Sequence, residues 1–267
     1  MTNSRGVITS SYLSLGGGAI YKLLLAVVCS IMLFSTQAKA EESGVFVGLQ
    51  AMYGDLRYSE NYTARAQPYE IDYYSSNNTA PGYGVVGGYK HFFSPWFGFR
   101  AYGQFFYNTF TFQGRSANYG AQGNLEGGKS SLYQFNLTAN AEALFNVIAG
   151  ENFNLGVFGG LGVGFQYWKS NRLDQVYKLH NTFLQQGQAF DKQDDRRFGV
   201  SLLWSAGIRM NFLKVNSIEI GATIPMFETT ILDYKGYWYG PTIPQGIEHK
   251  VHVRQSYNAF VRYTFGF

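Results

Sequence analysis

Runs of alternating apolar and polar residues constrain this chain most, because they extend far beyond the length of an ordinary strand. From Phe153 to Trp168, the odd-numbered positions are apolar or glycine, and Gly, Asn and Gln occupy most even-numbered positions. The 15 residues from Phe198 to Phe212 repeat the pattern. A period of two is typical of a β-strand with two different faces, whereas the usual strand has only about 5 or 6 residues. The chain is therefore predicted to form unusually long strands.

The residues on the second face distinguish a membrane barrel from a soluble sandwich or lipocalin, whose apolar face points inward. Here the second face holds Gly, Asn, Ser, Thr, Gln and isolated charges, while the apolar face is bulky and continuous. A membrane-spanning strand needs about 9–11 residues of this alternation, with aromatic residues at both interfaces. Aromatic residues cluster at the expected strand ends, as at Phe92–Phe97 and Tyr237–Tyr239. The pattern predicts an all-β, transmembrane, antiparallel up-and-down β-barrel.

Eight strands are expected, joined by connections that alternate in length. The expected strands cover residues 44–56, 82–92, 97–111, 131–148, 153–168, 197–212, 217–231 and 251–267. Short turns are expected at 93–96, 149–152 and 213–216, and long loops at 57–81, 112–130, 169–196 and 232–250. Short periplasmic turns with longer surface loops are expected of an outer-membrane barrel.

The N-terminal segment has the features of a secretory signal peptide. Lys22 precedes the apolar run Leu23–Ser35, and the segment ends in an A-x-A sequence at Ala38–Ala40. A membrane-anchor helix is the alternative, but such a helix needs about 20 apolar residues. We expect residues 1–40 to be removed, which leaves residues 41–267 as the barrel and removes the only cysteine, Cys29.

Removal of that segment also removes most of the apparent basicity. Of the 21 Lys and Arg residues, three lie in residues 1–40, which leaves 18 against 17 Asp and Glu. A balanced chain of this kind gives no indication of a nucleic-acid partner.

Several charged residues are expected to face the lumen of the barrel. An eight-stranded barrel has an interior that side chains can fill, and buried charges need partners. Arg209 and Glu219 flank a short turn at similar distances and should meet across the hairpin. We predict a lumen charge cluster in the periplasmic half, and expect Arg254 to face inward as well. The predicted cluster comprises Arg100, Glu142, Arg209, Glu219 and Arg262. Such a cluster favours a plugged lumen; an ion-conducting role is the alternative.

Catalytic chemistry is not predicted for this chain. Asp194, Asp195 and His180 could activate water, but their loop is an ordinary mixed-charge surface. His249 and His252 are three residues apart in an expected strand, so they should face opposite sides. No metal site or cofactor site is predicted, and the chain is not expected to be an enzyme.

Two groups of aromatic residues are predicted to have a role, one in assembly and one in surface contact. Tyr263, Phe265 and Phe267 end the chain and resemble the terminal aromatic signal that the outer-membrane assembly machinery recognises. Tyr and Trp provide contact area at low entropic cost. We therefore expect a candidate surface contact in the predicted loop 232–250, and merely belt or loop-packing aromatics are the alternative. The candidate contact residues are Tyr234, Tyr237, Trp238 and Tyr239.

The sequence resembles the Helicobacter outer-membrane protein family over nearly all of residues 42–267. The resemblance rests on ESGVFVGLQ, LYQFNLTANAEALFNVI, FNLGVFGGLGVGFQYW, FGVSLLWSAGIRMNF, IEIGATIPMF and VRQSYNAFVRYTFGF. It implies a barrel in the Gram-negative outer membrane, and large members of the family are adhesins with a helical surface domain and cysteine pairs. This chain lacks both features and resembles a small, barrel-only member. We expect a structural or surface-interaction role, with outer-membrane lipid, the assembly machinery, and a host glycan or protein as partners. A small porin is the alternative.

Overall fold

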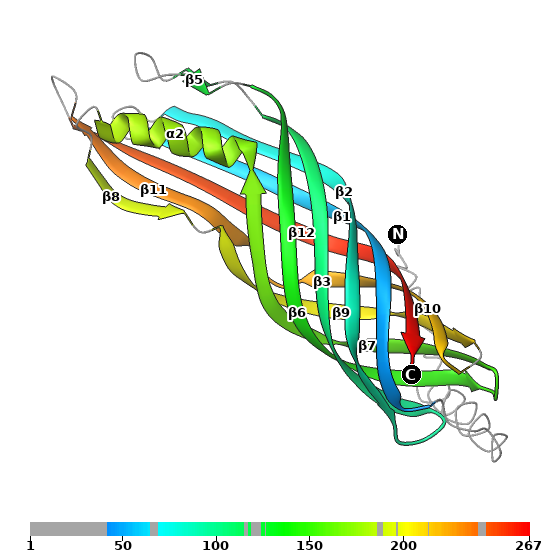
Figure 1. Cartoon of the computed structure of the whole chain (residues 1–267). Coiled ribbons are helices and arrows are strands. Elements are labelled where there is room, and N and C mark those ends of the chain that lie inside the picture. The colour runs from blue at the N-terminus through cyan, green and yellow to red at the C-terminus, as the bar shows by residue number, and fades with distance from the viewer. Residues whose placement is uncertain are drawn as a thin grey trace, which may run out of the picture. The chain divides into compact units, whose positions relative to one another are not determined.

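The alternating runs form antiparallel strands that close into a ring in the computed structural model (Figure 1). The last strand pairs with the first, so the predicted up-and-down barrel is confirmed. The structure describes residues 42–64, 69–114, 117–118, 124–125, 127–185, 189–195, 197–212, 214–239 and 244–267. Near some strand ends it describes the backbone but not every side chain. The predicted signal peptide, residues 1–40, lies outside the described residues.

Among the described residues, the strands occupy eight places around the barrel wall. The wall strands are β1 (Gly44–Ala64), β2 (Tyr69–Phe92), β3 (Phe97–Gly114), β6 (Gly128–Ala149), β7 (Phe153–Ser170), β8 (Ala189–Asp195), β9 (Phe198–Phe212), β10 (Asn216–Pro225), β11 (Thr229–Tyr239) and β12 (Pro244–Gly266). Two of the eight places are each shared by two strands that follow one another along the barrel: β9 with β8, and β10 with β11. A separate small sheet joins β4 (Ala117–Asn118) to β5 (Asn124–Leu125), and helix α2 covers Asn171–Gln185. Among the described residues, no helix is long and apolar enough to cross a membrane.

The prediction of one continuous seventh strand over residues 217–231 is wrong. β10 pairs with β9 and β12 and ends at Pro225, which has no backbone N–H to continue a ladder. β11 begins at Thr229, continues along β12, and pairs on its other edge with β8. At this break, the strand paired with β12 changes from β10 to β11.

The predicted long loops are wrong in part, because the strands continue into them. β1 and β2 remain paired as far as Ala64 and Tyr69, within the predicted loop 57–81. β11 and β12 likewise remain paired as far as Tyr239 and Pro244. The predicted loop 169–196 contains α2, which lies at the end of the barrel opposite the short turns (Figure 1). We call these two ends the α2 end and the turn end.

Outward aromatic side chains mark two levels on the wall. Neighbouring rings contact one another around the barrel, as Tyr83 and Tyr107 do at 5.4 Å and Tyr167 and Phe198 at 4.8 Å between ring centroids. Such belts mark the two membrane interfaces. The upper belt, nearer α2, contains Tyr53, Tyr83, Tyr107, Phe135, Tyr167, Phe198 and Tyr257. The lower belt contains Tyr89, Phe93, Phe97, Phe145, Phe153, Tyr263, Phe265 and Phe267. Several strands extend well beyond the upper belt, and we call this part the extension.

A β-bulge in β12 reverses which of its residues face the lumen. Asp55 of β1 pairs with Tyr257, but Leu56 pairs with Gln255, which leaves Ser256 as the extra residue. Even-numbered residues are buried below the bulge, whereas odd-numbered ones are buried above it. The prediction that Arg254 faces the lumen is therefore wrong, because the shift by one residue turns it outward, where it is exposed.

Candidate functional site

Four oppositely charged side chains meet inside the barrel towards the turn end. Arg100 of β3 lies directly opposite Glu142 of β6, and Glu219 of β10 lies directly opposite Arg262 of β12. Arg100 donates from Nε to Glu142 Oε2 at 2.6 Å and from Nη2 to Glu219 Oε2 at 2.9 Å. Arg262 Nη1 donates to the same oxygen of Glu219 at 3.3 Å. None of the four is more than 3% exposed, so strands from opposite sides of the ring are joined by buried ion pairs.

Arg209 completes this group, which we call the lower cluster. It lies opposite Glu219 in the β9–β10 ladder, as the turn spacing predicts. Its Nη2 donates to Asn146 Oδ1 at 2.6 Å, and its guanidinium carbon lies 5.0 Å from the centroid of the Phe92 ring. The lower cluster thus contains three arginines and two glutamates. Neutral groups, Asn146 and the Phe92 ring among them, compensate part of the excess positive charge.

Aromatic rings and hydroxyl groups surround the charges of the lower cluster. The guanidinium of Arg100 lies 4.9 Å from the Phe158 ring centroid, a distance that permits cation–π attraction. Glu142 accepts hydrogen bonds from the Tyr102 hydroxyl at 2.7 Å and from Ser205 at 2.6 Å. A Cβ at Gly160 would lie only 2.7 Å from Glu142 Cγ. The glycine therefore leaves the space that the buried carboxylate occupies.

A layer of amides fills the lumen above the lower cluster. Asn108 donates from Nδ2 to Gln134 Oε1 at 3.1 Å and to Asn258 Oδ1 at 3.2 Å. Gln255 accepts from Gln134 at 3.1 Å and donates to Asn258 at 2.6 Å. These four buried side chains come from β3, β6 and β12 and form one closed network across the interior.

An apolar layer follows the amides towards the α2 end. Tyr58 and Phe112 stack with ring centroids 4.3 Å apart, and Leu173 and Val176 of α2 are fully buried in the same layer. The layer contains Leu56, Tyr58, Ala80, Phe110, Phe112, Leu132, Trp168, Leu173, Val176, Ile231, Leu232, Tyr234, Val251 and Val253. Its apolar side chains come from both the wall and the helix, so burying them holds α2 over the interior.

A second charged group, which we call the Glu60 cluster, lies in the extension. Glu60 of β1 accepts from Arg172 Nε at 3.3 Å and from the Tyr58 hydroxyl at 3.2 Å. His249 Nε2 of β12 lies 3.0 Å from the other carboxylate oxygen. Arg172 is in the first turn of α2, so this buried carboxylate joins the helix to two strands of the wall.

The Glu60 carboxylate is held in its ionised form by these partners. Burial alone would raise its pKa, but hydrogen bonding and charge from His249, together with Arg172, lower the pKa to about 2. The carboxylate therefore stays ionised at pH values well above 2. The Glu60 cluster therefore attaches α2 to the wall.

The terminal aromatic residues face outward at the turn end. Tyr263, Phe265 and Phe267 are all exposed, and the backbone N–H of Phe267 donates to the Val45 carbonyl at 2.9 Å. They lie on the seam where β12 pairs with β1 (Figure 1). Their predicted role as an assembly signal stays a prediction.

The predicted surface contact is wrong for Tyr234. This side chain is only 1% exposed and belongs to the apolar layer, because β11 continues the inward alternation past the upper belt. The side chains of Tyr237, Trp238 and Tyr239 lie outside the described part of the structure.

The histidines and aspartates considered for catalysis are separated or outside the described part. His249 is buried in the Glu60 cluster while His252 lies partly exposed on the other face, so their predicted opposite orientation is confirmed. The side chains of His180, Asp194 and Asp195 lie outside the described part. Among the described residues, no group of three or more possible ligands has the geometry to hold a metal.

The sequence reasoning missed the Glu60 cluster because it ended the first strand at residue 56. The alternation of β1 continues through Leu56, Tyr58 and Glu60, all of which face the lumen. Extending the period-two pattern would have placed Glu60 inside. Its partner Arg172 lies on a helix that the alternating pattern does not predict.

Comparison with known protein families identifies the family to which this chain belongs. The family model of the Helicobacter outer membrane protein matches residues 84–267, more than half of the chain. Comparison with curated proteins gave no match. Among solved structures, the chain is similar to OprG from Pseudomonas aeruginosa, with 13% identity, a TM-score of 0.40 and coverage of 85% of this chain and 98% of that one. It is also similar to Neisserial surface protein A, with 9% identity, a TM-score of 0.36 and coverage of 84% and 98%. The chain belongs to the Helicobacter outer membrane protein family and is an outer-membrane β-barrel protein.

Proposed function

We propose that this protein is a closed, non-catalytic barrel that acts through the surface of its extension, in a structural or adhesive role. The observation that carries the proposal is the succession of three buried layers across the interior. The lower cluster, the amide network and the apolar layer beneath α2 follow one another from the turn end upward. An eight-stranded barrel has room for such side chains but little beyond them.

Conductance of the refolded full chain in a planar bilayer tests closure. We expect no steady current above the background of protein-free bilayers, while a general porin inserted in parallel gives open channels. Steady single-channel steps would contradict closure and would support the small-porin alternative.

The extension supports a role at the cell surface. β1, β2, β11 and β12 continue beyond the upper belt as paired strands, which present their hairpins on a rigid base. Host glycans and host surface proteins are the proposed partners. We expect bacteria that lack the protein to bind host cells and glycan arrays more weakly than the parent.

Substitution of the β11–β12 hairpin tests which residues make the contact. Changing Tyr237, Trp238 and Tyr239 together to serine should reduce binding of host cells by intact bacteria. The matched control is Tyr177→Ser, which removes an exposed tyrosine from α2. Unchanged binding by the triple variant, with normal surface amounts, would remove this hairpin as the contact.

The terminal aromatics are proposed to serve assembly in the membrane. Phe267 is 75% exposed, so its side chain adds little packing within the barrel. Deleting Phe267 should lower the amount of protein inserted in cells, while the refolded variant keeps the unfolding midpoint of the parent. A large loss of stability with normal insertion would contradict this role.

A further inference from the structure

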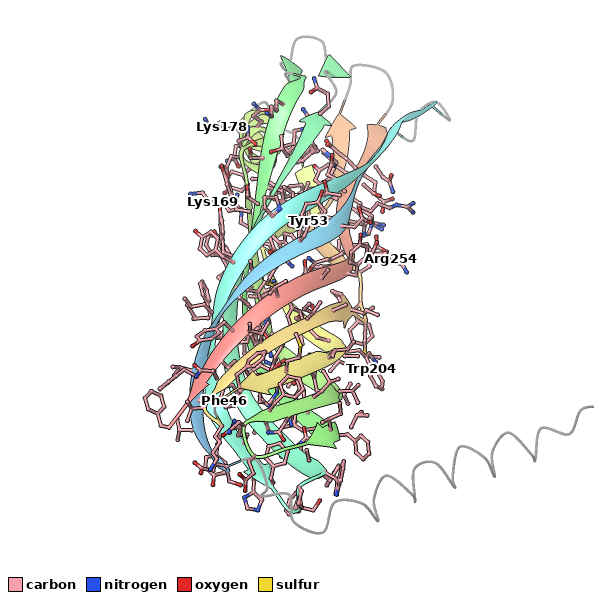
Figure 2. The ribbon with its side chains drawn as sticks, turned by 90° about the vertical axis from the view of Figure 1, so that its right-hand side faces the viewer. Phe46, Tyr53, Lys169, Lys178, Trp204 and Arg254 are labelled. Carbon is pink, nitrogen blue, oxygen red and sulfur yellow. The ribbon has the colours of Figure 1, made fainter. Side chains whose placement is uncertain are left out.

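Two arginines face each other on the outside of the barrel at its closing seam. Arg57 of β1 and Arg254 of β12 are direct partners in the antiparallel ladder, and both are exposed. The residues beside them, Leu56 and Val253 among others, are buried in the lumen. The two guanidinium groups therefore point away from the barrel, and Figure 2 shows Arg254 on its outer wall.

Two like charges directly opposite each other repel, which opposes pairing at this point of the seam. Side chains directly opposite in an antiparallel pair have Cβ atoms about 4.5–5.5 Å apart, and like charges at such positions destabilise the pair. Arg57 has an interaction within the chain, but the side chain of Arg254 makes no hydrogen bond or ion pair with any other described residue. On the outer face, Asp55 lies two residues from Arg57 on β1, and the exposed Glu228 immediately precedes Thr229, the β11 partner of Val253.

The position of the pair relative to the membrane indicates which external anion can reach it. Tyr53 and Tyr257 of the upper belt lie on the same two strands as the arginines, nearer the turn end. Arg57 lies four residues beyond Tyr53, which corresponds to about 13 Å along a strand and less along the tilted barrel axis. Belt tyrosines sit at the level of lipid headgroups, so the two guanidinium groups lie within reach of the charged groups of the outer leaflet.

We propose that Arg57 and Arg254 bind a phosphate group of a phosphorylated lipid headgroup in the outer leaflet. Each guanidinium presents parallel N–H donors that match phosphate oxygens, and one phosphate can accept from both. The bound anion removes the repulsion across the seam where the first and last strands meet. The lipid thus becomes part of the closure of the extension.

Lys169 provides a matched control for general attraction between basic residues and lipid. It is exposed, follows Tyr167 of the upper belt on β7, and lies on the other side of the barrel from Arg254 (Figure 2). Its ladder partner on β6 is Tyr133, so it does not face a basic residue on that strand.

Native mass spectrometry of the full refolded chain in detergent tests the proposal. The probes are a diphosphorylated lipid A, the same lipid with both phosphates removed, and inorganic phosphate. We expect the phosphorylated lipid to bind at least tenfold more tightly than the dephosphorylated one, and Arg254→Gln to lose about tenfold. The double variant R57Q/R254Q should lose the preference, and Lys169→Gln should keep it. Heat-modifiable gel migration checks that every variant is folded.

Three outcomes would overturn the proposal. Arg254→Gln could retain the full preference for the phosphorylated lipid, which would exclude this residue as a ligand. An equal loss in Lys169→Gln would assign the binding to diffuse basic charge. Displacement of the lipid by inorganic phosphate at similar concentration would assign the site to the free anion.

Discussion

The two charged groups inside the barrel differ in what they connect. The lower cluster lies at the level of the membrane and joins strands on opposite sides of the ring through Arg100, Glu219 and Arg262. The Glu60 cluster lies above the upper belt and joins α2 to β1 and β12. Ion pairs therefore connect strands of the wall to one another in the lower cluster, whereas they connect α2 to the wall in the Glu60 cluster.

The difference arises from the register of β12 on either side of Ser256. Below the bulge, Arg262 and Asn258 face the lumen, whereas Val253, Val251 and His249 do so above it. One extra residue thus lets a single strand contribute to a polar interior and to an apolar layer.

Deleting Ser256 should have the largest effect of the changes considered. Without the extra residue, a shift by one position turns Arg254 and His252 towards the apolar layer and turns Val253 outward. We expect the extension to lose its fixed structure while the part below the upper belt stays folded. Trypsin digestion of the protein in vesicles should then cleave within the extension only. The control, Ser256→Ala, keeps the register and should remain as resistant as the parent.

The next largest effect is expected from Glu219→Gln. The change removes the carboxylate shared by Arg100 and Arg262 and leaves two buried cations with less compensation. Breaking a buried pair in this way costs about 3–5 kcal/mol. The free energy of unfolding in lipid vesicles, measured with urea, should fall by that amount. Glu228→Gln, an exposed change in the break between β10 and β11, should leave it unchanged.

Much of the lower cluster could be predicted from the sequence, because it depends on alternation within strands that short turns hold in register. Arg209 and Glu219 flank such a turn, and Arg100 and Glu142 lie on adjoining strands. The pairing of Arg100 with Glu219 crosses the interior. No local pattern encodes that contact, since it depends on the diameter of the closed barrel.

The extension was less predictable for a physical reason. The alternation continues only briefly past Leu56, through Tyr58 and Glu60, and residues 57–81 as a whole have the composition of a loop. Their pairing is favoured by the neighbouring strands, which continue the ladder without a break. The bulge at Ser256 has no distinctive residue, so the reversal of Arg254 could not be foreseen.

Glu60→Gln tests the tie between α2 and the wall. The pKa of Glu60 is about 2, below its ordinary value of 4.5, so its ionised form stabilises the fold. That contribution, about 3 kcal/mol at neutral pH, should be complete above pH 4.5. It should decrease as the pH falls from 4.5 towards 2.

Hydrogen exchange of the α2 amides, corrected for the intrinsic rate at each pH, measures this opening. The Glu60→Gln variant should open more readily at neutral pH and should lack most of the change between pH 4.5 and 2. Asp174→Asn, which removes the half-exposed ion pair of α2 with Arg197, should cost less than about 1 kcal/mol. An identical pH profile in the parent and in Glu60→Gln would contradict the tie.

The smallest effect is expected from Glu248→Gln on the outer face of the extension. Glu248 forms ion pairs with Lys250 and, at 3.3 Å, with Lys235, and its pKa is lowered mainly by the hydrogen bond from Lys250. All three side chains are partly exposed, so water and salt weaken the attraction, and the loss should be about 0.2–1 kcal/mol. Repeating the urea measurement in 1 M salt should abolish this difference, because the Debye length is then about 3 Å. The loss in Glu219→Gln should persist in the same salt, because its partners are enclosed by the barrel. Equal sensitivity of both variants to salt would mean that the lower cluster is open to ions, which would contradict the closed interior.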